Sequence, residues 1–155
     1  MPDNKELILT RVFDAPREMV FKAWTDPDMV KQWWGPRGVT NPICEVDATP
    51  GGALNIVMEA GEELGLLKGQ KWPMRGEFKE VIEPEKLVFT GNAIINDKEI
   101  MQHLCTVTFE EKESKTVMTV HIVVTKITPE AEGALRGMEP GWNQQLDKLG
   151  EFLSK

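Results

Sequence analysis

The strongest constraint on the fold is a change in the spacing of apolar residues along the chain. From about residue 44 to residue 125, apolar and polar residues tend to alternate, which is typical of β-strands. Apolar residues then recur at helical spacing, at Trp142, Leu146, Leu149 and Leu153. A terminal helix with such a stripe needs a wide apolar surface to cover, and only the sheet is large enough. The sequence therefore predicts an α+β fold with a long C-terminal helix packed on one sheet face.

Turn residues divide the alternating region into candidate strands. A first strand is predicted at 7–13, and the later strands are expected at 43–48, 53–59, 72–82, 86–95, 101–110 and 115–125. Because most of the connections are short, consecutive strands are expected to pair antiparallel. The segment 60–70 contains three glycines and is expected to be a flexible loop.

Two short helices are predicted between the first strand and the sheet. They are expected to begin at Asp14 and at Asp26, each followed within two residues by a proline. The second helix ends at Trp33-Trp34-Gly35-Pro36. Neighbouring helix positions lie about 100° apart, so adjacent tryptophans do not share one face. We expect one ring to enter the core and Trp34 to cover a second surface, such as a pocket mouth or a dimer contact.

The C-terminal helical region contains residues that disfavour a continuous helix. Gly133, Gly137, Pro140 and Gly141 are expected to break or kink it near residue 140. Such a break is consistent with the hinge of a lid and equally with a simple bend.

Composition excludes several classes of protein. A length of 155 residues predicts a single domain over 1–155. The formal net charge of −7 argues against a nucleic-acid partner, which requires clustered Lys and Arg. No apolar run approaches the ~20 residues of a membrane span, and the polar N-terminus does not resemble a signal peptide. Two cysteines without CxxC spacing predict a reduced, cytoplasmic protein. No motif indicates an oligomeric state.

Strand alternation identifies the polar residue best suited to a binding site. His103 shares one face of its predicted strand with Cys105 and should point inward, whereas His121 in the next strand should face solvent. A metal site needs three or four converging ligands, and nothing brings Cys44 or His121 to this pair, so no metal is expected. His103 is then either a satisfied core histidine or a group that orients a ligand. Cys105 is expected to be inert, because burial raises the pKa of a thiol.

The order of predicted elements resembles the helix-grip (START-like, SRPBCC) superfamily. Within it, the chain is similar to the bacterial relatives of the C-terminal domain of the Hsp90 ATPase activator. The residues that carry the resemblance are Arg11–Pro16, Trp33–Pro36, Gly76–Phe78, Pro84–Thr90, Val107–Glu110 and Gly141–Leu153. The resemblance implies a helix-grip fold: a curved antiparallel sheet of about six or seven strands wrapped on a long C-terminal helix, with two short helices after the first strand. It also implies an open cavity between sheet and helix, which holds apolar small molecules in many relatives.

Aromatic and methionine side chains suit an apolar cavity of this kind, although plain core packing explains each of them equally well. The expected ligand-binding residues are Trp72, Met74, Phe78, Phe89, His103, Cys105, Met138 and Trp142. No catalytic residue and no cofactor is expected, since neither a Ser-His-Asp arrangement nor a phosphate-binding glycine motif occurs.

Three functions remain open at this point. The leading hypothesis is non-catalytic binding of a small apolar or aromatic molecule. The second is a chaperone-linked protein-interaction module related to the Hsp90 activator. Hsp90 itself is a doubtful partner, because the chain lacks the N-terminal domain of the eukaryotic activators and fold alone does not transmit function. The third is an enzyme with His103 as a general base in the pocket.

Overall fold

A computed structural model describes residues 6–95, 98–129 and 138–154. Within these ranges, seven strands form one antiparallel sheet in the order β1-β7-β6-β5-β4-β3-β2. The strands are β1 (Glu6–Phe13), β2 (Val39–Val46), β3 (Ala53–Ala60), β4 (Lys71–Ile82), β5 (Lys86–Ile95), β6 (Lys98–Lys112) and β7 (Lys115–Ile127). The first strand in the chain therefore pairs with the last, and β1 and β2 form the two edges of the sheet.

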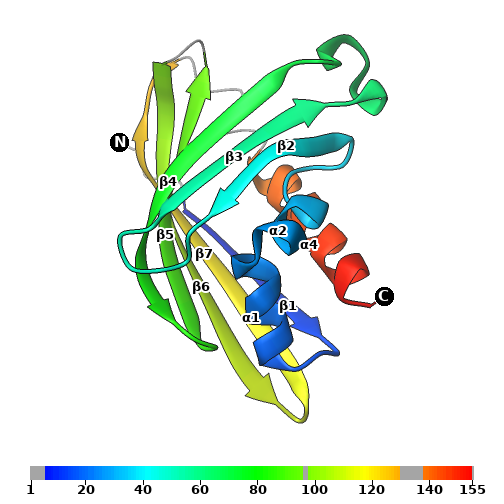
Figure 1. The fold of residues 1–155 in the computed structure, drawn as a ribbon, viewed down its shortest axis with the longest axis vertical. Coiled ribbons are helices and arrows are strands. Elements are labelled where there is room, and N and C mark those ends of the chain that lie inside the picture. The colour runs from blue at the N-terminus through cyan, green and yellow to red at the C-terminus, as the bar shows by residue number, and fades with distance from the viewer. Residues whose placement is uncertain (1–5, 96–97, 130–137, 155) are drawn as a thin grey trace.

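The described residues form three α-helices, which lie on one side of this sheet. The helices α1 (Arg17–Thr25) and α2 (Pro27–Trp33) follow β1, and α4 (Met138–Leu153) ends the described chain. The sheet curves around α4, and α1 and α2 lie beside it on the same side (Figure 1). This arrangement confirms the predicted α+β helix-grip fold.

Alternation along the strands places the core on the side of the helices. On β7, the side chains of Met118, Val120, Ile122 and Val124 are at most 4% exposed. The side chain of His121, which lies between them in sequence, is 38% exposed and contacts Glu6 on the outer face. The predicted parity of this strand is therefore correct.

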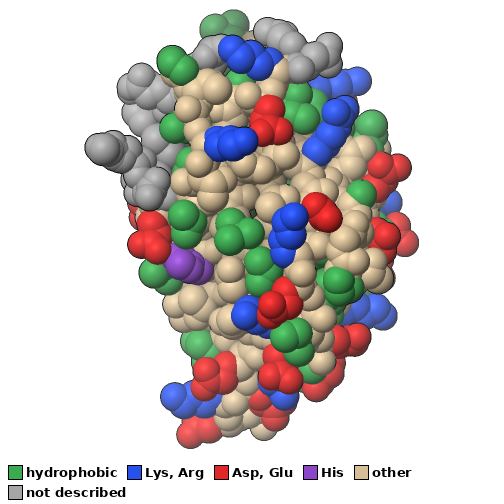
Figure 2. All heavy atoms as spheres, turned by 90° about the vertical axis from the view of Figure 1, so that its left-hand side faces the viewer, with side chains coloured by type: hydrophobic (Ala, Val, Ile, Leu, Met, Phe, Trp, Pro, Cys, Tyr) green, Lys and Arg blue, Asp and Glu red, His purple; other side chains and the backbone are tan. Residues whose placement is uncertain are grey.

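The opposite face of the sheet carries apolar and charged side chains side by side (Figure 2). The β1 residues Ile8 and Val12 are 59% and 61% exposed there, and they pair with His121 and Val117 of β7. Such scattered apolar residues are normal on a protein surface. The inner face, by contrast, is continuous with the hydrophobic core.

The two short helices begin differently from one another. Asp26 caps α2 as predicted, because its side chain accepts a hydrogen bond of 2.9 Å from the backbone N–H of Asp28. The prediction that Asp14 caps α1 is wrong: α1 is preceded by Pro16 at the N-cap, and no side chain caps it. Ala15 precedes a proline and is disfavoured from helical geometry, so the helix starts two residues later than expected.

Other boundaries also depart from the predictions. The strand expected at 43–48 begins at Val39, because an irregularity between Thr40 and Ile43 interrupts the alternation that would have revealed it. The segment expected to be a flexible loop contains a short 3-10 helix, Glu62–Leu67, divided at Gly65.

The expected break near residue 140 does not occur in the described part of α4. This helix runs through Pro140 and Gly141, since a proline in the first turn removes no helical hydrogen bond. Gly133 and Gly137 lie outside the described residues. Across the described ranges, no helix is long and apolar enough to cross a membrane.

Candidate functional site

His103 lies on the inner face of β6, between the side chains of Met101 and Cys105. It is 7% exposed, and Met101 and Cys105 are 7% and 0% exposed. The pairing of β6 with β7 is irregular between Gln102 and His103. The inward orientation that alternation predicts for His103 is therefore correct, and the residue is buried in the core.

The ring of His103 lies over Gly91, its partner on the neighbouring strand β5. A Cβ on Gly91 would be 2.6 Å from Cε1 and 2.7 Å from Nε2 of His103, and 3.2 Å from Sδ of Met74. Real Cβ atoms essentially never approach other atoms as closely as 2.7 Å. Because Gly91 has no side chain, the imidazole of His103 has room to lie there, and Met74 lies beside it.

His103 is buried without a hydrogen bond. Within the described part of the chain, neither Nδ1 nor Nε2 has a partner, although both atoms are inaccessible to solvent. Burial disfavours the charged imidazolium and lowers the pKa of His103 to about 4. The ring is consequently neutral near pH 7, with one N–H donor and one bare nitrogen acceptor.

Most of the other expected ligand-binding residues are also buried on the inner side of the sheet. Trp142 and Met138 belong to α4 and are 8% and 7% exposed. The strand residues Met74, Phe78 and Phe89 are at most 8% exposed. All of these side chains belong to one contiguous core.

Ring contacts connect α4 with the strands of this region. The ring of Trp24 lies between those of Trp142 and Phe89, with centroids 6.4 Å and 6.3 Å away. Phe78 packs on Phe89 at 5.8 Å. Trp72, near the start of β4, is only half-buried, so it lies nearer the surface than the rest of the expected set.

Trp34 does not cover a surface, contrary to the prediction. Its side chain is 4% exposed, and its ring packs edge-on against Trp142 at 5.7 Å and against Trp24 at 6.2 Å. Trp33 is fully buried and donates a hydrogen bond of 2.9 Å from Nε1 to the carbonyl oxygen of Ala23. The two adjacent rings contact each other at 5.6 Å, and Trp142 of α4 packs against the second one.

Cys105 is completely buried, and burial raises the pKa of its thiol far above the usual range. Its thiol therefore stays protonated and is a poor nucleophile. As a general base, His103 would be weak at neutral pH, because its pKa lies well below that pH. Over the ranges 6–95, 98–129 and 138–154, no group of three His, Cys, Asp or Glu side chains is arranged to hold a metal ion.

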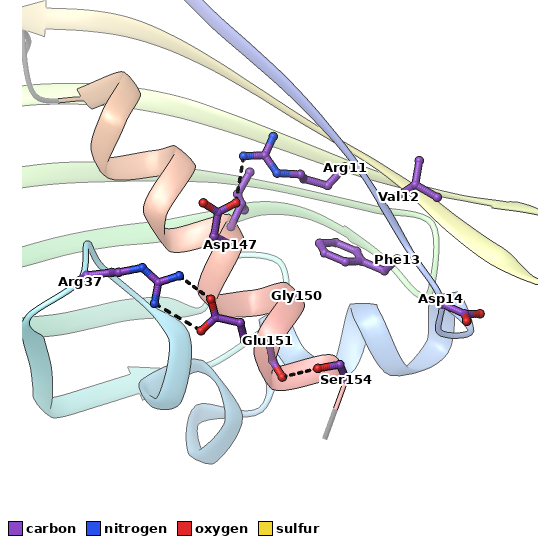
Figure 3. A pocket seen from close by; sticks show the side chains of 10 residues that line it. Arg11, Val12, Phe13, Asp14, Arg37, Asp147, Gly150, Glu151 and Ser154 are labelled. Carbon is purple, nitrogen blue, oxygen red and sulfur yellow. Dashed lines mark hydrogen bonds and ion pairs between the residues drawn. The ribbon is translucent and has the colours of Figure 1, made fainter.

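A polar groove, which sequence reasoning missed, separates β1 from α4 (Figure 3). It has a volume of about 530 Å³. Arg11 of β1 donates a hydrogen bond of 2.8 Å to Oδ1 of Asn143 and lies 3.5 Å from Asp147, and Arg37 forms an ion pair with Glu151. In the sequence, Asp147 and Glu151 lie four residues apart on the predicted helix and so share one of its faces. This spacing was the sequence signal for a polar surface on the helix. Both arginines pair with side chains of α4, so these contacts join the helix to β1 and to the turn before β2.

The whole chain can now be compared with known proteins. It matches the model of the family described as Activator of Hsp90 ATPase homolog 1-like protein over residues 14–154. The chain belongs to this family. The membership agrees with the fold, which is that of the helix-grip, or SRPBCC, superfamily. No curated protein sequence gives a significant match.

Solved structures of bacterial proteins share this fold. The AHSA1 protein SPO3351 from Silicibacter pomeroyi is 26% identical, with a TM-score of 0.76 over 97% of this chain and 98% of that one. The protein NE0264 from Nitrosomonas europaea is 25% identical, with a TM-score of 0.75 over 96% and 94%. The protein CV1439 from Chromobacterium violaceum is 24% identical, with a TM-score of 0.79 over 97% of both chains.

Proposed function

We propose that this protein binds a small apolar or aromatic molecule between the inner face of the sheet and α4, without chemically transforming it. One observation carries the proposal: His103 is buried in an apolar region with neither ring nitrogen hydrogen-bonded in the described part of the chain. The great majority of buried polar side-chain atoms in proteins have a partner. A ligand that brings a polar group to His103 would supply that partner.

The surrounding side chains support an apolar ligand. Ligand sites are mostly lined by hydrophobic and aromatic groups, with a few polar groups that fix orientation. Here the thioether of Met74 borders the space that His103 occupies, and Met74 belongs to the same hydrophobic core as the aromatic rings of Phe89 and Trp142. Methionine adapts readily to different ligand shapes, because it has three rotatable bonds and a polarisable sulfur.

The fold supports the same conclusion. Helix-grip proteins commonly bind ligands between the sheet and the terminal helix, and the chain belongs to a family with that fold. The low pKa of His103 and the protonated thiol of Cys105 favour binding over catalysis. His103 would then orient the ligand rather than remove a proton from it.

A thermal-shift screen tests this proposal. The purified protein is screened against hydrocarbons, sterols, fatty acids, flavonoids and polyaromatic compounds. A compound present at 100 times its Kd should stabilise the folded state by about 2.7 kcal/mol. If no compound in any class raises the melting temperature, the proposal is wrong.

A matched pair of substitutions locates the binding site. Met74→Trp fills the space beside His103 and should abolish the shift that a hit produces. Met19 on α1 is 49% exposed, so Met19→Trp adds the same side chain at the surface and should leave the shift intact. Retention of the full shift by a folded Met74→Trp variant would place the ligand elsewhere.

A further inference from the structure

The hydrogen-bonding capacity of His103 restricts the polar group that a ligand can present. A neutral imidazole carries one donor and one acceptor, and both stay unpaired in the described part of the chain. A hydroxyl group matches either nitrogen, because one oxygen both donates and accepts. A carbonyl or ether can only accept, so it would be restricted to the N–H side of the ring.

The charge of the surrounding core restricts the ligand further. The buried polar residues of the described chain are Asn41, His103, Thr116 and Gln145, and none of them is ionised at neutral pH. Thr116 donates to the carbonyl oxygen of Ala15. Among the described residues, no buried side chain would therefore supply a cation for a ligand carboxylate or an anion for a ligand ammonium. Burying either charged group without such a partner costs far more than burying a neutral group.

The position of the ring is fixed by the backbone beneath it. Gly91 lets the imidazole lie against β5, where Cε1 and Nε2 of His103 and Sδ of Met74 all lie within 3.2 Å of the position that a Cβ on Gly91 would take. A group that bonds to His103 there meets the thioether of Met74 on one side.

We propose that the ligand is an uncharged molecule with a hydroxyl group on an apolar, aromatic body, and that this hydroxyl hydrogen-bonds to His103. The inference rests on the proposed function and specifies its ligand class. Phenolic compounds and aromatic alcohols belong to this class, whereas fatty acids, aromatic carboxylates and amines do not.

Three probes with the same ring system test the ligand class: naphthalene, naphthol and naphthoate. Near neutral pH naphthol is uncharged and naphthoate is an anion. We expect naphthol to bind the wild-type protein about tenfold more tightly than naphthalene, which corresponds to one net hydrogen bond. Naphthoate should bind more weakly than both. Titrations of isotope-labelled protein followed by NMR measure all three affinities.

Substitutions then assign the preference to His103. His103→Phe removes both nitrogens. This variant should bind naphthol and naphthalene about equally tightly. His103→Gln retains a donor and an acceptor and should restore part of the preference. His121→Phe is the matched control, because His121 lies on the outer face, and it should leave the tenfold preference unchanged.

The outcomes separate this inference from the proposed function. Equal binding of naphthol and naphthalene to the wild-type protein overturns the ligand class, while binding itself still supports the proposed function. A preference that persists in His103→Phe overturns the role of His103. Failure of all probes and of the wider screen overturns both proposals.

A measurement on the wild-type protein covers the case in which a His103 variant does not fold. The imidazole nitrogen resonances of His103 should shift on addition of naphthol and not on addition of naphthalene. If naphthol binds and these resonances do not move, the hydroxyl does not bond to His103.

Discussion

Two regions of the protein treat buried polar groups in opposite ways. The first is the junction of α4 with the turn Trp33–Arg37. There Nζ of Lys148 lies 3.3, 3.2 and 3.3 Å from the carbonyl oxygens of Trp34, Gly35 and Pro36. Oε1 of Gln145 accepts a hydrogen bond of 2.8 Å from the N–H of Gly35. The second region surrounds His103, where neither nitrogen is bonded in the described chain.

The difference indicates which polar groups serve the fold. At the junction, Asn41 Oδ1 and Gln145 Nε2 have no partner among the described residues. The other amide atom of each side chain is hydrogen-bonded: Asn41 Nδ2 donates to the backbone, and Gln145 Oε1 accepts from it. Gln145 holds the turn after α2 against α4, and Asn41 holds α2 and this turn against β2. The ring of His103 forms no hydrogen bond to the described residues, so no such bond explains why a histidine is buried at this position.

The largest effect is expected at the junction, from Trp33→Ala. The side chain is fully buried, packs on Trp24 at 4.8 Å and donates to the carbonyl oxygen of Ala23. Its removal should lower the free energy of unfolding by about 3–5 kcal/mol, measured by urea denaturation. A loss below about 1 kcal/mol would show that the turn contributes little to the fold.

The next largest effect is the dependence of stability on pH that His103 causes. Burial lowers the pKa of His103 from 6.5 to about 4, so between these values the unfolded chain binds more protons than the folded one. Stability should therefore fall as the pH decreases from about 6.5 toward 4, by about 3 kcal/mol from this residue.

The control for this pH dependence is His103→Phe, which lacks the titrating group. The difference in unfolding free energy between the two proteins, followed against pH, isolates the contribution of His103 from those of the carboxylates. Near neutral pH the substitution should be close to neutral, because it removes an unpaired polar group. A pH-independent difference would contradict a buried, neutral His103.

A smaller effect is expected from Lys148→Met, which keeps the apolar stem and removes the ammonium group. Three carbonyl oxygens at the end of α2 then lose their shared donor. We expect a loss of about 1–2 kcal/mol in chemical denaturation. If His103→Phe lowers the free energy of unfolding at neutral pH as much as Lys148→Met does, the two regions do not differ in how their polar groups contribute to stability.

Local patterns allowed much of the fold to be predicted. Most strand limits were close, β2 excepted, because alternation and turn residues lie within each segment. The same alternation placed His103 inward and His121 outward. Local rules also predicted the cap at Asp26. They failed where two local rules competed, as at Asp14, where the proline two residues later moved the start of α1.

The rest of the candidate site depends on segments far apart in the chain. Gly91 gives His103 its space only because β5 and β6 pair in one register, and a shift of one residue would point each side chain to the other face. Arg11 reaches Asp147 across the groove only because β1 is an edge strand beside α4.

The sequence by itself determined the order of strands and helices, the family and the inward face that carries His103. These depend on periodicity and motifs within single segments, which each segment satisfies on its own. Only the tertiary structure decided that Trp34 is buried, that Gly91 makes room for the imidazole and that His103 has no partner in the described chain. Each of these depends on which atoms of distant segments meet in space, and local periodicity does not contain that information.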